Sequence, residues 1–315
     1  MLKEKALKKI LISTIALFTF LLVYLIGNIQ PEKTLEASLE LEYVTGLGTN
    51  YIYLLNKDNY LVKTKVLITQ NSIEEKAKEI IENLIIDSKK IFPNELKGIL
   101  PKGTKVLDIY YDEECITINF SKEILNTSST LEEKILESIT YSICSLKKVK
   151  GIYIQVEGKP LLKYPNSKKK ISYPLTKQIG INKEYNIDRR ENINKVVVYY
   201  LTDINNENYY IPVTKYLNSS NDKIKVIIDS LTTSYIYEPN LMSFLNTNVK
   251  LNEYNIEDNI FFLDFNKALY DSNNKVLEEV IYSISYSVFD NYDVDSIIFR
   301  VDNKDIKTIN NRDLP

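Results

Sequence analysis

The 315-residue sequence contains no histidine, no tryptophan, two cysteines and eight glycines. Without histidine the chain can form no Ser-His-Asp triad, no Cys-His dyad and no histidine-ligated metal site. Two cysteines alone are too few for a cysteine-based zinc site. None of the glycines stands in the G-x-x-x-x-G-K pattern of a phosphate-binding loop. We therefore expect no catalytic residues, no cofactor and no bound metal, and we expect that the protein is not an enzyme.

The composition is that of a folded protein, with 44% hydrophobic and 26% charged residues. The net charge of −2 is unevenly spread, because residues 1–30 carry four lysines against one glutamate. The remaining 285 residues are therefore weakly acidic. A weakly acidic surface offers no electrostatic footprint for nucleic acid.

A nearly continuous apolar run covers residues 10–27 and is interrupted only by three hydroxyl residues. Its length is close to the ~20 residues that cross the hydrocarbon core of a membrane. Lysines precede the run, and no basic residue follows it until Lys33. The positive-inside rule then predicts a cytoplasmic segment at 1–9 and a single transmembrane anchor at 10–27. A cleaved signal peptide is the alternative, although the run ends without a small-residue cleavage site.

After a stalk at residues 28–48, the order of sequence patterns runs twice. Each half starts with two apolar runs joined by a polar turn, which predicts a pair of strands. An amphipathic helix, a second strand pair, a second helix and a last strand follow. In the first half, Ser72 and Glu75 form a capping box at the start of the first helix. Phe120 aligns with Phe265, and an offset of 145 residues holds without a gap to the last strand.

We therefore predict an α+β protein made of two tandem β-β-α-β-β-α-β domains. In each domain we expect a single sheet with two helices packed on one face. The first domain is expected at 49–162 and the second at 193–310, joined by a linker at 163–192. The linker contains two prolines and three consecutive lysines, which we interpret as a solvated basic stretch.

The residues of the first repeat resemble a known domain. The resemblance rests on three motifs: Pro101-Lys102-Gly103-Thr104, Phe120-Ser121-Lys122-Glu123 and Val156-Glu157-Gly158-Lys159-Pro160. They resemble the GerMN domain family of sporulation and spore germination proteins, here in two tandem copies. The resemblance implies a ring-building-motif-like fold and a role outside the cytoplasm of spore-forming bacteria. It also implies association with the apparatus that joins mother cell and forespore, and it transfers no catalytic residues. Members of the family are usually lipoproteins, and this chain has no cysteine near its apolar run.

The cysteines and carboxylates that could form a functional site can be explained by structure alone. Cys115 and Cys144 align with Ile260 and Phe289, which favours two free thiols near the core over a disulfide. The densest carboxylate clusters, Asp112-Glu113-Glu114 and Glu257-Asp258, fall on predicted hairpin turns, where they are expected to face water. A glycan hydrolase would instead need two carboxylates opposed across a cleft.

The best-aligned segment of the two repeats lies on the second helix. Tyr141 and Tyr286 occupy the same position there, and we expect their rings to pack on the sheet rather than bind a ligand. Four aligned serines are expected to allow close approach of another element: Ser138, Ser142, Ser283 and Ser287. No adjacent base is available to make them nucleophiles.

Our first functional hypothesis is a single-pass membrane protein whose two domains lie outside the cytoplasm. It would act as a non-enzymatic scaffold that binds other extracytoplasmic sporulation proteins, including further copies of itself. The alternative is a protein that binds or modifies cell-envelope glycan, such as spore cortex peptidoglycan. A small-molecule sensor is a third hypothesis. No nucleic-acid partner is expected.

Overall fold

The structure is a computed structural model, and it describes residues 13–15, 17–19, 21, 49–86, 88, 92–93, 95–233, 241–311 and 314. The chain divides into two compact units, residues 1–47 and 48–315, and the second unit contains both repeats. Of the anchor predicted at 10–27, the described residues are helical. No helix among the described residues is long and apolar enough to cross a membrane. The rest of the anchor, with 1–9 and 28–48, lies outside the described residues, so the anchor and its orientation stay predictions.

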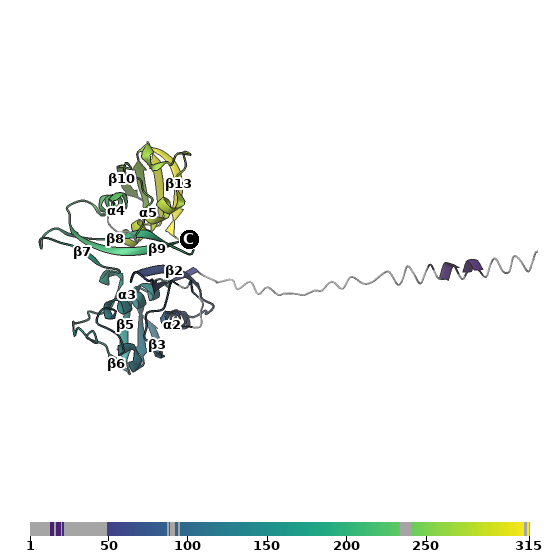
Figure 1. Cartoon of the computed structure of the whole chain (residues 1–315), viewed down its shortest axis with the longest axis horizontal. Helices are drawn as coiled ribbons and strands as arrows, with labels where there is room; N and C mark the ends of the chain where they lie inside the picture. The colour runs from purple at the N-terminus through teal and green to yellow at the C-terminus, as the bar shows by residue number, and fades with distance from the viewer. Residues whose placement is uncertain are drawn as a thin grey trace, which may run out of the picture. The chain divides into compact units, whose positions relative to one another are not determined.

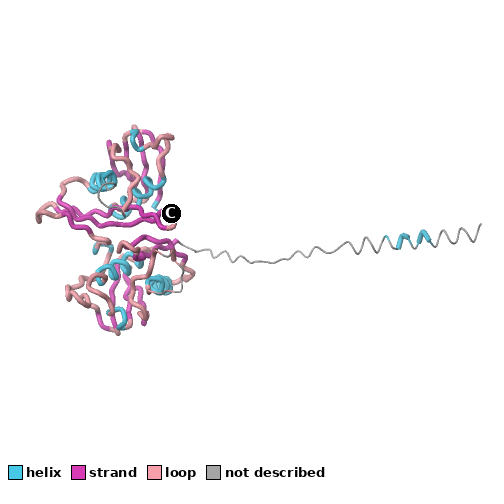
Figure 2. The backbone as a smooth tube through the Cα atoms, in the orientation of Figure 1, coloured by secondary structure: helices cyan, strands magenta, loops and turns pink. Residues whose placement is uncertain are grey.

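The predicted order of elements is confirmed in both repeats, and each repeat has one additional strand at its end (Figures 1 and 2). The first repeat consists of β1 (Thr49–Leu55), β2 (Leu61–Leu67), α2 (Ile73–Leu84), β3 (Val106–Asp112), β4 (Cys115–Phe120), α3 (Glu132–Ile143), β5 (Gly151–Val156) and β6 (Lys159–Pro160). The second consists of β8 (Ile193–Ile204), β9 (Glu207–Asn218), α4 (Lys223–Thr233), β10 (Leu251–Glu257), β11 (Ile260–Phe265), α5 (Glu278–Asn291), β12 (Ser296–Val301) and β13 (Lys304–Asn310). Between them lies β7 (Glu184–Asn186).

Each repeat contains a four-stranded sheet with the same topology. The strand orders are β3-β4-β5-β6 and β10-β11-β12-β13. The outer pairs are antiparallel and the middle pair is parallel, and the second helix of the repeat makes the crossover. Alternation along β4 and β11 buries one face of each sheet, as predicted. Phe120 and Phe265 both lie on that face and are fully buried.

The opening hairpins do not belong to these sheets. β1, β2, β7, β8 and β9 form a separate five-stranded sheet in which β2 of the first repeat pairs with β9 of the second, at Lys63 and Tyr210. β7 pairs with the same edge of β9 at Lys215, and β8 pairs with the other edge. The prediction of a single sheet in each repeat is therefore wrong, because the first two strands of both repeats combine into one shared sheet.

The second helix of each repeat explains this arrangement. Ten of the twelve residues of α3 between Glu132 and Ile143 are buried, including five polar ones: Glu132, Glu137, Ser138, Thr140 and Ser142. A helix that is buried all round needs cover on more than one side. The four-stranded sheet covers α3 through β5, and the opening hairpin covers it through β1. In the second repeat α5 packs in the same way against β8.

The segment predicted as a linker is part of the folded unit. Within residues 163–192, Ile171, Leu175 and Ile181 are buried. Leu175 forms an isolated bridge with Ile152 on β5. The lysines at 168–170 are exposed, as expected of a solvated stretch. This segment therefore packs along the first repeat and leads into β7.

Candidate functional site

The two repeats are joined where β2 and β9 pair, and one side chain from the connecting segment completes the contact (Figure 1). Asn182 is 4% exposed. Its Oδ1 accepts from the Leu61 N–H at 2.9 Å, and its Nδ2 donates to the Leu61 and Pro212 carbonyls at 2.9 and 2.8 Å. The amide therefore provides both strands with hydrogen bonds that a neighbouring strand would otherwise provide.

A buried charge pair fixes Asn182 on α3. The Asn182 N–H donates to Glu137 Oε2 at 2.9 Å, and the other oxygen of this carboxylate lies 3.0 Å from Lys183 Nζ. Burial raises the pKa of Glu137 although Lys183 lies beside it. Burial alone would lower the pKa of Lys183, but the neighbouring carboxylate raises it. Removing Lys183 would leave the buried Glu137 carboxylate without this charge, whereas Lys183 also contacts Glu133 at 3.3 Å.

The two outer edges of the shared sheet are covered by helical serines. At β1, Ser138 Oγ donates to the Tyr53 carbonyl at 2.7 Å, and the Tyr53 N–H donates to Ser142 Oγ at 3.0 Å. At β8, the Tyr199 N–H donates to Ser287 Oγ at 2.9 Å. The close approach expected at these serines is confirmed. The hydroxyls also satisfy backbone groups that an open sheet edge would leave available for association.

The aligned tyrosines pack as expected, but against the opening hairpins rather than the four-stranded sheets. The Tyr141 ring meets Tyr53 on β1 edge-on, with centroids 5.5 Å apart. The Tyr286 ring stacks on Tyr199 of β8 at 5.2 Å. The Tyr141 hydroxyl donates to the Lys177 carbonyl at 3.0 Å, which ties α3 to the connecting segment.

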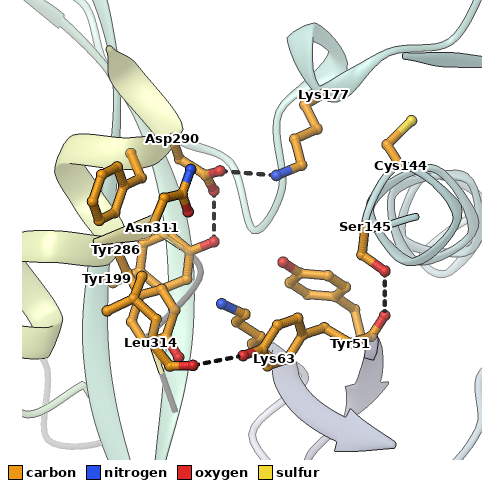
Figure 3. A pocket seen from close by; sticks show the side chains of 12 residues that line it. Tyr51, Lys63, Cys144, Ser145, Lys177, Tyr199, Tyr286, Asp290, Asn311 and Leu314 are labelled. Atoms are coloured by element: carbon orange, nitrogen blue, oxygen red, sulfur yellow. Dashed lines mark hydrogen bonds and ion pairs between the residues drawn. The ribbon is translucent and has the colours of Figure 1, made fainter. Parts of the chain in front are cut away.

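A pocket of about 220 Å³ lies between the repeats beside the shared sheet (Figure 3). Repeat-equivalent residues line its opposite sides: Tyr53 and Tyr199 from the hairpins, and Cys144 and Phe289 from the helices. The pocket therefore lies where equivalent surfaces of the two repeats face each other.

Lys63 projects from β2 into this pocket (Figure 3). Its Nζ lies 3.5 Å from the Tyr286 ring centroid and 3.9 Å from that of Tyr51. Ring faces attract a cation electrostatically but do not neutralise it. Burial lowers the pKa of Lys63 well below its usual value, and the charge of Asp290 opposes this shift only in part.

Asp290 and Lys177 form an ion pair across the pocket, with Nζ and Oδ1 2.8 Å apart. The Tyr199 hydroxyl donates to the other carboxylate oxygen at 2.5 Å. Burial alone would raise the pKa of Asp290, but Lys177 and these hydrogen bonds hold it below the usual value. Ser145 occupies the equivalent position in the first repeat and donates to the Tyr51 carbonyl instead. The pocket is therefore asymmetric, because the second repeat supplies a carboxylate where the first repeat has a serine.

The two cysteines are free thiols, as the sequence favoured. Burial raises the pKa of Cys144 to about 11, so this thiol stays protonated near neutral pH and is a poor nucleophile.

The acidic clusters are exposed on the β3–β4 and β10–β11 turns, which confirms their interpretation as solvated turns. Glu114 forms an ion pair with Lys150 at 2.7 Å. In the described part of the chain, no group of three or more histidine, cysteine or acidic residues is placed to hold a metal ion.

Sequence analysis missed the main residues of the junction. Lys63 and Lys65 lie two residues apart on β2, and nothing in the sequence distinguishes the half-buried Lys63 from the exposed Lys65. Asn182 and Lys177 lie in a segment that was interpreted as a linker. Asp290 could have been identified from the sequence, because the alignment of the repeats pairs it with Ser145, and only one of the two residues is charged.

Comparison with known proteins agrees with this architecture. The family model described as Germane, sporulation and spore germination, matches residues 51–162 and 197–307, once in each repeat. The spore germination protein GerM of Bacillus subtilis (strain 168) is 29% identical over 263 residues, which cover 80% of this chain and 71% of that protein. The solved structure of the tandem GerMN domains of the Bacillus subtilis sporulation protein GerM superposes with a TM-score of 0.75 at 26% identity, covering 81% of this chain and 91% of that one. This chain therefore belongs to the Germane family of sporulation and spore germination proteins and carries two GerMN domains in tandem.

Proposed function

We propose that this protein is a non-enzymatic, membrane-anchored scaffold that acts outside the cytoplasm during sporulation or germination. It binds partner proteins of the apparatus between mother cell and forespore. The junction carries the proposal, because β2 and β9 share a sheet and Asn182 bonds to both strands. Two domains fixed in this way present one composite surface, on which contacts to a partner act together.

The first strands of the two four-stranded sheets support a role in protein binding. β3 and β10 are edge strands. Leu107 and Tyr110 on β3 are 48% and 59% exposed, and Ile256 on β10 is 47% exposed. Exposed edges with apolar side chains are sites where a partner can add a strand or pack an apolar face.

The test is spore yield in a strain that carries variants of the chromosomal copy, with protein abundance followed by blotting. Deleting the predicted anchor at 10–27, or either domain, should abolish sporulation or germination. Neutralising the acidic turns at 112–114 and 257–258 should leave both intact, because binding energy is spread over a patch. Catalysis instead collapses when one group is lost. A single carboxylate substitution that destroys function in a folded, abundant protein would contradict the proposal.

The predicted topology has its own test. Protease added to protoplasts should trim the protein to a short membrane-bound fragment, because the lysines before residue 10 hold the N-terminus inside. Complete protection of the chain would contradict an extracytoplasmic location. Release of a soluble form that starts after residue 30 would indicate cleavage instead of anchoring.

Cell-envelope glycan binding is the alternative, and one observation favours it. Tyr185 is 63% exposed and stacks on Tyr216, with ring centroids 4.9 Å apart. Exposed, stacked aromatic rings offer a flat surface of the kind on which sugar rings pack. Sedimentation with purified peptidoglycan, compared between the wild type and Tyr185→Ala, separates this alternative from protein binding.

A further inference from the structure

We propose that the pocket between the repeats binds a small monovalent organic anion, a carboxylate attached to a flat apolar body. The carboxylate lies at Lys63, and the apolar body lies among the surrounding aromatic rings. This assigns a ligand site to the junction and goes beyond the scaffold role, which does not depend on it.

Lys63 is half-buried and, in the described part of the chain, has no carboxylate partner of its own. A lysine that is partly withdrawn from water ordinarily pairs with a carboxylate. Lys63 Nζ contacts the rings of Tyr51 and Tyr286, and no carboxylate of the described residues lies within 4 Å of it. The other lysine of the pocket, Lys177, is already paired with Asp290. One positive charge therefore remains available in the pocket.

The net charge of the pocket sets the charge of the ligand. The three charged side chains of the pocket, Lys63, Lys177 and Asp290, leave a single positive charge. A monovalent anion balances it, whereas Asp290 repels the second charge of a phosphate dianion. Figure 3 shows the Lys177 ammonium directed at Asp290 and the Lys63 ammonium separate from that pair, so Lys63 is the cation available to a ligand.

The size and the lining of the pocket set the body of the ligand. The pocket volume of about 220 Å³ is several times the ~30 Å³ that one water molecule occupies in the liquid. Five of the twelve residues that line it are aromatic: Tyr51, Tyr53, Tyr199, Tyr286 and Phe289. Ring faces favour offset stacking with another flat, apolar group. A single ring that carries one carboxylate fits both the volume and the walls.

Binding should also be linked to pH through Lys63. Its pKa is depressed by burial, and a ligand carboxylate would raise it again, so binding takes up a proton over the pH range in which free Lys63 loses its charge. The other groups that face Lys63 keep one charge state over this range. Asp290 has a lowered pKa and Lys177 a raised one, and the pKa of each facing tyrosine is raised by burial: Tyr51, Tyr53, Tyr199 and Tyr286. Affinity should therefore fall as pH rises through the lowered pKa of Lys63.

Isothermal titration of the purified full-length protein with benzoate tests the proposal. Benzamide, acetate and inorganic phosphate serve as the neutral, ring-free and dianionic comparisons. We expect saturable one-to-one binding of benzoate, weaker binding of acetate and phosphate, and no binding of benzamide. Lys63→Met should reduce benzoate affinity at least about tenfold, which corresponds to ~1.4 kcal/mol. Lys65→Met is the matched control, because Lys65 lies two residues along the same strand and is exposed.

A second variant protects the test against a misfolded Lys63→Met protein. Lys63→Arg keeps the charge but does not titrate below pH 12, so it should retain benzoate binding with a flat pH profile. The wild type should instead bind more weakly as pH rises. Absence of saturable benzoate binding, equal binding of benzamide, tighter binding of phosphate, or unchanged affinity in Lys63→Met would each overturn the proposal.

Discussion

The four-stranded sheets of the two repeats are alike, whereas their opening hairpins differ. Both sheets have the same strand order, and both contain a register irregularity at the same place, between Val106 and Asp108 and between Leu251 and Glu253. The hairpin strands β1 and β2 have seven residues each, whereas β8 and β9 have twelve. The duplicated part is therefore the individual domain, and the diverged part is the element that joins the domains.

The longer hairpin explains how the junction forms. β9 is long enough to pair with β2 near Tyr210 and with β7 from Lys215 onward, on the same edge. Asn182 bonds to Pro212 between these two pairings, at a residue that has no backbone N–H of its own. A hairpin as short as that of the first repeat could not reach both strands. The difference in length thus creates a joint from two similar domains.

The largest expected effect tests the equivalence of the two domain cores. Phe120→Ala and Phe265→Ala should each destabilise the protein by about 3–5 kcal/mol, because each removes a fully buried ring. Phe265 also stacks on Phe299, whereas Ile154 stands at the equivalent place in the first repeat. We therefore expect the second substitution to cost at least as much as the first. Urea unfolding of the purified variants measures both.

Small effects at both phenylalanines, similar to those of surface substitutions, would contradict the alignment of the repeats. Leu107→Ala is a suitable control, because this apolar residue on β3 is 48% exposed. Its substitution should change the unfolding free energy by no more than about 0.5–1 kcal/mol.

Asn182→Ala should have the next largest effect. The substitution removes three hydrogen bonds, one each from the Leu61 N–H, the Leu61 carbonyl and the Pro212 carbonyl. Their loss should reduce the unfolding free energy by about 2–4 kcal/mol in total. Because the lost bonds join the repeats, unfolding should also become less cooperative, with separate transitions for the two domains. Asn186→Ala, at an exposed position on β7, is the control. A single, sharp transition at the wild-type midpoint would show that Asn182 does not hold the repeats together.

The comparison also explains what could be predicted from the sequence. Alternation along β4 and β11, and the helical periodicity from Ile73, are local patterns, so these elements and their buried faces were predicted correctly. The shared sheet could not be predicted, because the pairing of Lys63 with Tyr210 joins residues that are far apart in the chain. Strand patterns indicate which face is buried and do not identify the neighbouring strand.

The candidate site was missed for a related reason. The burial of Lys63 depends on Tyr286, which belongs to the other repeat, and no local pattern reports that contact. The low apolar content of residues 163–192 suggested a solvated linker. Ile171, Leu175 and Ile181 are nevertheless buried, and the polar residue Asn182 replaces strand hydrogen bonds. Polar composition alone therefore did not distinguish a linker from a buried joint.

A smaller effect separates two aligned serines. Ser138 donates a hydrogen bond to the Tyr53 carbonyl, whereas the equivalent Ser283 is buried with no partner for its hydroxyl among the described residues. Ser138→Ala should cost about 1 kcal/mol, the usual net value of a buried hydrogen bond. Ser283→Ala should be neutral or slightly stabilising, since it removes an unsatisfied polar group. Equal destabilisation in thermal or urea unfolding would indicate that both hydroxyls have the same role.

The smallest expected effect concerns the turns that join the first two strands of each four-stranded sheet. Glu113 and Glu114 both have positive φ, at 44° and 64°, as do Asp258 and Asn259 in the second repeat. Both central residues of a two-residue type I′ turn need this conformation, which asparagine adopts more readily than glutamate. Glu114→Asn, which copies the second repeat, should therefore stabilise the first slightly, by a few tenths of a kcal/mol. The substitution also removes the ion pair with Lys150, but exposed pairs of this kind contribute only ~0–1 kcal/mol.

Glu114→Gln is the control, since it removes the charge without the backbone preference. If Glu114→Asn is no more stable than Glu114→Gln in urea unfolding, the backbone preference does not separate the two turns.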